Sequence, residues 1–231
     1  MTEKLDKSVC ECNNPFIVNN SALSEQEVEF LKQNCKLVEF SAGDFIFRQN
    51  FITTDYHFLQ KGLIKIVKRG KQNKTLIINI LGDDNFFGVI STAGDSIYQY
   101  SAQAVEKSVV CKINKKCVKK VCEQNGKFAL QLTQLVSTKG LMLLERLMNF
   151  YQKQLPSRVA DIFLYFSEDL FKSESFIMPF TRKELSEFVG STKESFIRTL
   201  TEFRNDKIIK MEGKKVEIIS LDILKKLSEI G

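Results

Sequence analysis

The sequence predicts an α+β chain in which an antiparallel β domain precedes a long helix and a C-terminal helix-turn-helix with a β-hairpin behind it. Short β-branched and aromatic runs broken by glycine fill about residues 37–113, which is typical of an antiparallel sandwich or barrel. Residues 127–155 lack proline and place apolar side chains at helical spacing. Two capped helical segments then flank Gly190, and a hairpin pattern follows them.

Composition sets the class of protein but not its function. The 231 residues suffice for two modest domains. The net charge of +6, from 34 Lys and Arg against 28 Asp and Glu, is compatible with a polyanionic partner without demanding one. No apolar run approaches the roughly 20 residues that span a bilayer, and the N-terminus has no apolar stretch typical of a secretory signal. We therefore expect a cytoplasmic protein whose six cysteines are thiols, metal ligands or redox groups.

Four segments are expected along the chain. Residues 1–20 form an N-terminal arm, 21–125 the β domain, 126–155 the long helix and 156–231 the helix-turn-helix domain. A short helix opens the β domain, because Ser24 and Glu27 fit a capping box. Strands are expected at about 45–47, 62–67, 76–81 and 108–113.

The long helix carries an apolar seam. Its members are Leu141, Leu144, Met148, Tyr151 and Leu155. Their spacings of 3, 4, 3 and 4 residues are those of a coiled coil about two heptads long. A second stripe, slightly out of register, comprises Phe128, Leu132, Leu135 and Met142. One stripe would pack on the β domain and the other on a partner chain, but burial of the helix within its own domain fits the spacing as well. Pro156 is expected to end the helix and mark a hinge.

Two helices with capping signals surround Gly190. Thr181 and Glu184 fit a capping box, and Gly190 can take the left-handed conformation that ends such a helix. A second capping box is expected at Ser191 to Glu194, with Ser191 as the cap. The buried face of this second helix would be Phe196, Ile197, Leu200 and Phe203. With strands at 207–211 and 215–219 behind them, the two helices predict a winged helix-turn-helix.

The outer face of the second helix is polar. Lys193 and Arg198 can donate to guanine O6 and N7, and Glu194 can accept from cytosine N4, so we expect these three residues to read bases. The expected phosphate ligands are Thr181, Arg182, Thr192, Ser195 and Thr201. The alternative is a face that is only solvated. Glu194 favours base contact, because its carboxylate would be repelled by phosphate on a surface that binds only the DNA backbone.

The run from Phe180 to Leu200, FTRKELSEFVGSTKESFIRTL, closely resembles the signature of the CRP/FNR transcription regulators. That signature begins Thr-Arg-x-(Asp/Glu)-(Ile/Leu), continues to a glycine and ends Glu-(Thr/Ser)-x-x-Arg. The resemblance extends over about residues 20–231, because the family combines a β-roll sensor of the cyclic-nucleotide-binding type, a long dimerisation helix and a winged helix-turn-helix. It implies a bacterial, sequence-specific DNA-binding regulator and not an enzyme.

The same resemblance implies partners. The seam of the long helix would form the interface of a homodimer. Glu194 and Arg198, with Lys193 beside them, would read TGA-containing half-sites in double-stranded DNA. A two-fold dimer predicts a pseudo-palindromic operator. RNA polymerase is a further expected partner, and no membrane partner is expected.

The effector of the β-roll is a separate question. In cyclic-nucleotide-binding relatives, a Phe-x-Gly-Glu-Leu run and a later Arg-Ser-Ala hold the ribose and the cyclic phosphate. The corresponding pocket candidates here are Phe87, Gly88, Val89, Tyr100 and Ser101. Val89 stands at the glutamate position and Tyr100 at the arginine position, so the acceptor and the counter-charge are both missing. Cyclic AMP is therefore not an expected ligand.

The cysteines offer an alternative effector. Oxygen-sensing FNR relatives hold an iron–sulfur cluster with three N-terminal cysteines and one on a β-roll strand. The resemblance suggests Cys10, Cys12 and Cys111 here, which leaves a four-thiolate cluster one ligand short unless Cys35, expected in a helical region, or another group completes it. Cys111 is otherwise an ordinary buried residue. We predict no cofactor and no metal, and keep a redox or iron–sulfur-responsive regulator as the alternative.

Other functions have less support in the residues present. Cys117 and Cys122 lie among lysines whose charges would make thiols reactive, although a solvated basic face explains the lysines as well. His57 is the sole histidine and is expected as a surface or strand residue. A metal-dependent cupin-like enzyme would need several histidines, and a cyclic-nucleotide-binding module would need what Val89 and Tyr100 replace. No catalytic residue is expected.

Overall fold

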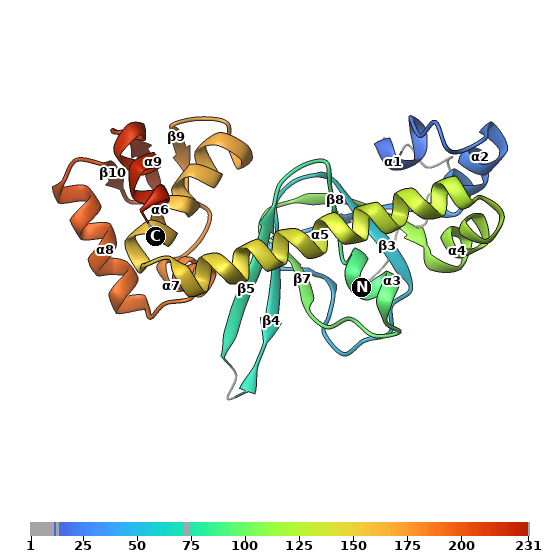
Figure 1. Ribbon diagram of the computed structural model, residues 1–231, viewed down its shortest axis with the longest axis horizontal. Helices are drawn as coiled ribbons and strands as arrows, with labels where there is room; N and C mark the ends of the chain where they lie inside the picture. Colours follow the sequence, from blue (N-terminus) through green and yellow to red (C-terminus); the bar gives the residue numbers. More distant parts are fainter. Residues whose placement is uncertain (1–11, 13, 72–73, 231) are drawn as a thin grey trace. The chain divides into compact units, whose positions relative to one another are not determined.

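A computed structural model describes residue 12 and residues 14–71 and 74–230 of the chain. The described residues fall into two compact units, one from those up to residue 69 with 79–141 and one from those in 70–78 with 142–230. Figure 1 shows the mainly β first part, the long helix α5 (Gly126–Gln152) and the mainly helical C-terminal part. No helix among the described residues is both long and apolar enough to cross a bilayer.

The N-terminal part of the chain, mostly the first unit, is an antiparallel β-roll, as predicted. Strand orders β1-β8-β3-β6 and β2-β7-β4-β5 define two four-stranded sheets. The strands are β1 (Cys35–Phe40), β2 (Phe45–Phe47), β3 (Asp55–Lys61), β4 (Ile64–Arg69), β5 (Thr75–Leu81), β6 (Asn85–Phe87), β7 (Ser101–Ala104) and β8 (Ser108–Asn114). The strands expected from short β-branched and aromatic runs are confirmed. β1, β3, β6 and β7 have weaker patterns and were not singled out.

Short helices close the ends of the roll. They are α1 (Pro15–Val18), α2 (Glu25–Gln33), α3 (Val89–Gly94) and α4 (Lys115–Gln124). The predicted capping box of α2 is confirmed, since Ser24 Oγ accepts from the Glu27 backbone N–H and the Glu27 carboxylate accepts from the Ser24 N–H. α1 was not predicted, because four residues carry no periodicity. It begins with Asn14 as its cap and Pro15 in its first turn.

The second apolar stripe of α5 packs on the β-roll. Phe128 is fully buried, and Leu132 and Leu135 lie against the same core together with Phe16 of the arm. Met142, the fourth member expected in this stripe, is exposed. The packing of this stripe on the β domain therefore ends before Met142, close to Leu141, the first residue of the seam.

The end of the long helix differs from the prediction. α5 ends at Gln152, and Leu155 and Pro156 open the next helix, α6 (Leu155–Leu164). Proline suits the first turn of a helix, because the N–H it lacks would have no intrahelical acceptor there. Leu155 is consequently not part of the seam on α5.

The C-terminal unit is a winged helix-turn-helix, as predicted. After α6 come a π-helical turn η2 (Tyr165–Leu170), β9 (Ser175–Ile177), α7 (Arg182–Val189), α8 (Lys193–Asn205), β10 (Ile209–Glu212), β11 (Lys215–Ile218) and α9 (Leu221–Glu229). β9 adds an unpredicted third strand to the wing by pairing with β11. The core is aromatic: Phe166 stacks on Phe180 and Phe188, at ring-centroid distances of 5.8 and 6.3 Å.

Candidate nucleic-acid interface and sensor site

The first helix of the helix-turn-helix is fixed at both ends. Thr181 Oγ1 accepts from the Glu184 backbone N–H at 3.2 Å, and the Glu184 carboxylate accepts from the Thr181 N–H at 2.8 Å. Gly190 ends α7 at φ 68° and ψ 46°, a left-handed conformation that favours glycine. Both features confirm the prediction for α7.

The second helix begins one residue later than predicted. Thr192, not Ser191, is its cap, because Thr192 Oγ1 accepts from the Ser195 backbone N–H at 3.1 Å. The Ser191 hydroxyl instead donates to the Thr192 carbonyl. Gly190 and Ser191 together make the turn, and α8 starts at Lys193. Lys193 and Glu194 thus occupy the first turn.

One stripe of α8 faces away from the core. Lys193, Glu194 and Arg198 are exposed on it, whereas Phe196, Leu200 and Phe203 are buried as expected. Ile197, predicted in the buried face, is 40% exposed. At about 100° per residue, Ile197 lies between Lys193 and Thr201 in the outward stripe, and Thr199 is buried in its place. An apolar side chain in such a stripe suits the methyl group of thymine.

The predicted phosphate ligands divide into two groups. Hydrogen bonds within their own helix engage all four hydroxyls: those of Thr181, Thr192 and Thr201 donate, and that of Ser195 accepts from Thr192 Oγ1. The fifth ligand is a guanidinium. Arg182 lies at the start of α7, and burial together with the nearby charge of Arg204 lowers its pKa. Arg204, in the last turn of α8, was missed from the sequence because it lies outside the signature. The pair concentrates positive charge where two helices meet, which suits a phosphate.

The seam of α5 is solvent-exposed in the single chain. Leu144 is 54% and Tyr151 89% exposed, and Leu141 and Met148 also lie in solvent. Leu147, not predicted in the seam, is exposed beside them. So large an apolar surface is unusual on a monomer and marks an interaction face.

The candidate effector pocket is filled by aromatic side chains of the protein itself. The Phe47 ring stacks on Tyr98 with centroids 4.0 Å apart, and lies 6.0 Å from the rings of Phe87 and Tyr100. A Cβ at Gly88 would lie 3.0 Å from Phe47 Cε1. Val89 is buried, and the hydroxyl of Ser101 accepts from the Gln49 backbone N–H. The predicted residues are therefore neighbours around a packed aromatic interior, and neither Val89 nor Tyr100 carries the positive charge that would hold a phosphate.

His57 belongs to the same aromatic cluster. It is a strand residue of β3 and only 1% exposed, with its ring 5.0 Å from that of Phe47. Burial, and secondarily the charge of Lys112, lowers the pKa of His57 to about 3. The imidazole is thus neutral at physiological pH. Its Nδ1 has no hydrogen-bond partner among the residues that the structure describes.

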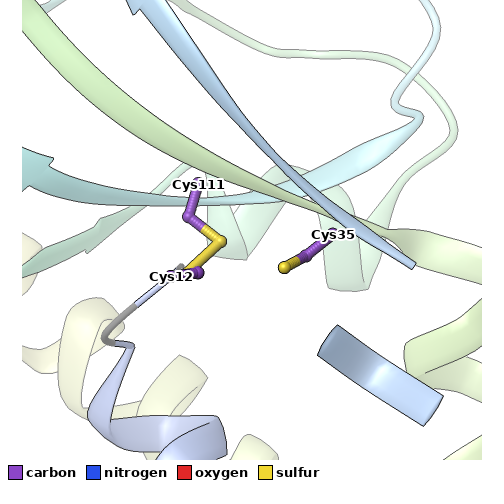
Figure 2. Close-up of side chains that lie close together, drawn as sticks. All are labelled: Cys12, Cys35 and Cys111. Atoms are coloured by element: carbon purple, nitrogen blue, oxygen red, sulfur yellow. A yellow bond between two sulfur atoms is a disulfide. The ribbon is translucent and has the colours of Figure 1, made fainter. Parts of the chain in front are cut away.

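Three cysteines meet at the other side of the β-roll. The sulfur atoms of Cys12, Cys35 and Cys111 lie within 4.8 Å of one another, and all three residues are buried. Figure 2 shows Cys12 and Cys111 joined by a disulfide and the sulfur of Cys35 directed toward them. The Cys35 thiol donates to the carbonyl of Lys32 at 3.4 Å. Cys10, the third ligand suggested from the sequence, lies outside the described residues.

Strand pairing explains why Cys35 joins this group. Cys35 is the first residue of β1 and not part of a helix as expected, since α2 ends at Gln33. It pairs with Ile113 of β8, two residues from Cys111. Residues two apart on a strand share a face of the sheet, so Cys35 and Cys111 point to the same side. This register is not visible in the sequence, which is why Cys35 was expected only as a possible completing ligand and not among the main three.

The second cysteine pair lies on one helix. Cys117 and Cys122 lie on α4, and burial raises the pKa of the Cys122 thiol, opposite to the expected effect of the lysines. Lys116, Lys119 and Lys120 are exposed, as a solvated face requires. Lys115 turns inward, where its ammonium donates to Thr53 Oγ1 and to the Asp95 carbonyl.

Family models match both units. Residues 37–125 match a cyclic nucleotide-binding domain, and residues 157–227 match a Crp-like helix-turn-helix domain. Together the two matches cover more than half of the chain.

Known proteins of the same architecture are regulators. The chain is 27% identical to the fumarate and nitrate reduction regulatory protein of Vibrio cholerae, over 98% of this chain and 90% of that one. It is 24% identical to the transcriptional activator protein anr of Pseudomonas aeruginosa, over 77% and 74%. Two solved structures share the fold: a putative transcriptional regulator of the crp/fnr family from Eubacterium rectale (TM-score 0.77, 16% identity, 90% and 95% covered) and FixK2 from Bradyrhizobium japonicum (TM-score 0.76, 15% identity, 84% and 96% covered).

Proposed function

Because this chain belongs to the CRP/FNR family of transcription regulators, we propose that it acts as a homodimer on a pseudo-palindromic operator with TGA-like half-sites. It is a DNA-binding transcription regulator, and its relatives are regulators and not enzymes. The observation that carries the proposal is the exposed stripe of α8, where Lys193, Glu194 and Arg198 stand together on a helix capped at Thr192.

Each residue of the stripe has a role that its chemistry suits. Arg198 donates in bidentate fashion to guanine, Glu194 accepts from cytosine N4, and Lys193 donates to guanine or to a phosphate. Ile197 covers a thymine methyl group between them. Arg182 and Ser195, at the N-termini of α7 and α8, contact the phosphates that fix the register. Arg204 adds a further phosphate contact.

The seam on α5 provides the two-fold interface. Burying its exposed leucines and Tyr151 against a second copy removes an apolar surface that a soluble monomer would not keep in water. Two recognition helices related by the two-fold axis then address half-sites one helical turn of DNA apart. RNA polymerase is the further partner that such a regulator requires.

A binding-site selection with the full-length protein tests this function. Random double-stranded DNA is bound, recovered and sequenced over several rounds. We expect an inverted repeat whose half-sites are centred about 10 base pairs apart, and a complex that contains two chains. Recovery of DNA without a shared sequence would contradict the proposal.

A second proposal concerns the signal that controls the regulator, and it rests on the group of three cysteines. Cys12, Cys35 and Cys111 offer three buried sulfurs within 4.8 Å, and thiolates are the ligands of iron–sulfur clusters. They fit three corners of a four-thiolate site. A sulfur in the disulfide cannot bind iron, so the reduced thiols and the Cys12–Cys111 disulfide are mutually exclusive states. We propose a redox-responsive regulator that uses this site, and not cyclic AMP, as its trigger.

Iron analysis of anaerobically purified protein tests the second proposal. We expect iron and inorganic sulfide bound to the wild type, with broad visible absorption. Cys35→Ser and Cys111→Ser should lose the colour, because serine is a poor ligand for iron in a cluster. Cys117→Ser is the matched control, since Cys117 lies on α4 outside the group, and it should keep the colour. A colourless, iron-free wild type would reject the cluster and leave operator binding untouched.

A further inference from the structure

The turn of the helix-turn-helix is covered by two side chains of α5, one helical turn apart. Arg146 donates through Nη2 to the carbonyl oxygen of Phe188, at 2.6 Å. Its guanidinium carbon lies 4.0 Å from the centroid of the Phe188 ring. Phe188 is in the last turn of α7, where carbonyl groups have no intrahelical donor. Arg146 therefore caps α7 with a charge that suits the negative end of the helix dipole.

Phe150 completes this contact. A Cβ placed on Gly190 would lie 3.0 Å from Phe150 Cε1, so the ring of Phe150 covers the residue that makes the turn. Arg158 of α6 donates to the Phe150 carbonyl at 3.1 Å, and the guanidinium carbons of Arg146 and Arg158 lie 5.2 and 5.6 Å from the Phe150 ring. Both guanidinium groups are within the range of a cation–π contact with this ring.

The same guanidinium also contacts Ile77, a residue of the same compact unit. Arg146 Nη2 lies 3.4 Å from the carbonyl oxygen of Ile77, a longer and weaker hydrogen bond. Ile77 and residues 142–230 belong to one compact unit. Burial lowers the pKa of Arg146 to about 10, which still leaves it charged at neutral pH. Arg146 is half-buried, so its guanidinium gives up part of its hydration, and the hydrogen bond to the Phe188 carbonyl offsets that loss.

Helical geometry separates this contact from the seam. At about 100° per residue, Arg146 and Phe150 lie on the side of α5 opposite to Leu144 and Met148. One face of α5 is thus the proposed dimer face, and the other holds the turn between α7 and α8.

We propose that Arg146 is a positioning residue for DNA recognition: it ties the turn of the helix-turn-helix to the last part of α5 and to Ile77, which lie in the same compact unit, so that the orientation of α8 follows theirs. The inference rests on the proposed function of α8 as the recognition helix. Arg146 itself does not contact DNA. It acts through the Phe188 carbonyl and the ring of Phe150.

Operator binding by full-length variants tests the inference, with the DNA obtained by the selection above. Arg146→Gln should weaken operator binding about 10- to 100-fold, the loss expected for a hydrogen bond to a charged group. The slope of log affinity against log salt should not change, because no phosphate contact is lost. Dimer mass and the affinity for unrelated DNA should stay at the wild-type value. Asn149→Ala, at an exposed neighbour on α5, is the matched control and should bind like the wild type.

The outcomes separate this inference from the proposed function. Arg146→Lys keeps the charge and loses the planar fork, so it supplies the answer if Arg146→Gln does not fold. Wild-type operator affinity in a folded, dimeric Arg146 variant would overturn the inference while operator binding stands. A reduced salt slope would also overturn it, because Arg146 would then contact DNA directly. If the wild type selects no operator, the proposed function fails first.

Discussion

Arg198→Ala should lower the affinity for the selected operator about 10- to 100-fold, while binding to unrelated DNA changes little. The exposed guanidinium on α8 is the group suited to bidentate contact with guanine, and such a contact contributes about 1–3 kcal/mol of discrimination between bases. The loss should be confined to one position of each half-site. Repeating the selection with the variant measures this directly, since the preference at that position should relax and the others should persist.

Arg204→Ala is the matched control for Arg198, because it removes the same group from the same helix. Arg204 lies beside Arg182 and is expected to contact a phosphate. Its loss should weaken binding to all sequences alike and reduce the salt slope by about one. An Arg198→Ala protein that retains the wild-type sequence preference would reject the assignment of base reading to this stripe. If Arg198→Ala and Arg204→Ala lose affinity equally for all sequences and show the same salt slope, Arg198 contacts the DNA backbone and not a base.

Leu144→Glu should convert the dimer to a monomer at micromolar concentration and abolish operator binding with it. Leu144 is central to the exposed seam on α5, and a two-fold interface would bury one introduced carboxylate from each chain. An unpaired charge in an apolar interface costs about 3 kcal/mol or more, which is about 100-fold in the dimerisation constant. Sedimentation of the full-length protein gives the mass, and a binding titration gives the affinity.

Asn149→Glu provides the control for the dimer experiment. It introduces the same charge into the same helix, but about 120° away from the centre of the seam. This variant should remain dimeric and bind the operator. A Leu144→Glu protein that sediments as a dimer would show that the seam is not the interface.

Most of the winged helix-turn-helix domain could be predicted from the sequence, because the sequence patterns that indicate its helices are local. The capping box at Thr181, the glycine at the turn and the apolar face of α8 each depend on a few neighbouring residues. The errors are local as well. Ser191 and Thr192 are both competent caps, and only the backbone decides between them. Ile197 follows a buried phenylalanine, so its exposure depends on how α8 rolls against the domain, which spacing alone leaves open.

The sensor was harder to predict, because its site is assembled from distant strands. Cys12 and Cys111 are 99 residues apart in sequence, and Cys35 joins them only through the register of β1 on β8. The aromatic filling around Phe47 likewise depends on β2, β3 and β6 meeting inside the roll. The valine and tyrosine at positions 89 and 100, where nucleotide-binding relatives carry glutamate and arginine, could be read from the sequence. What occupies that space could not.

The contact between Phe150 and Gly190 also constrains how this protein can evolve. Any side chain at position 190 meets both an unfavourable backbone conformation and the ring of Phe150. A change at 190 therefore requires the ring of Phe150 to shift by a few tenths of an ångström. A smaller residue at 150 would make that room, but it would remove the ring that the guanidinium groups of Arg146 and Arg158 contact. Among homologous chains, these four positions should covary as a set, and variation at one of them should predict variation at the others.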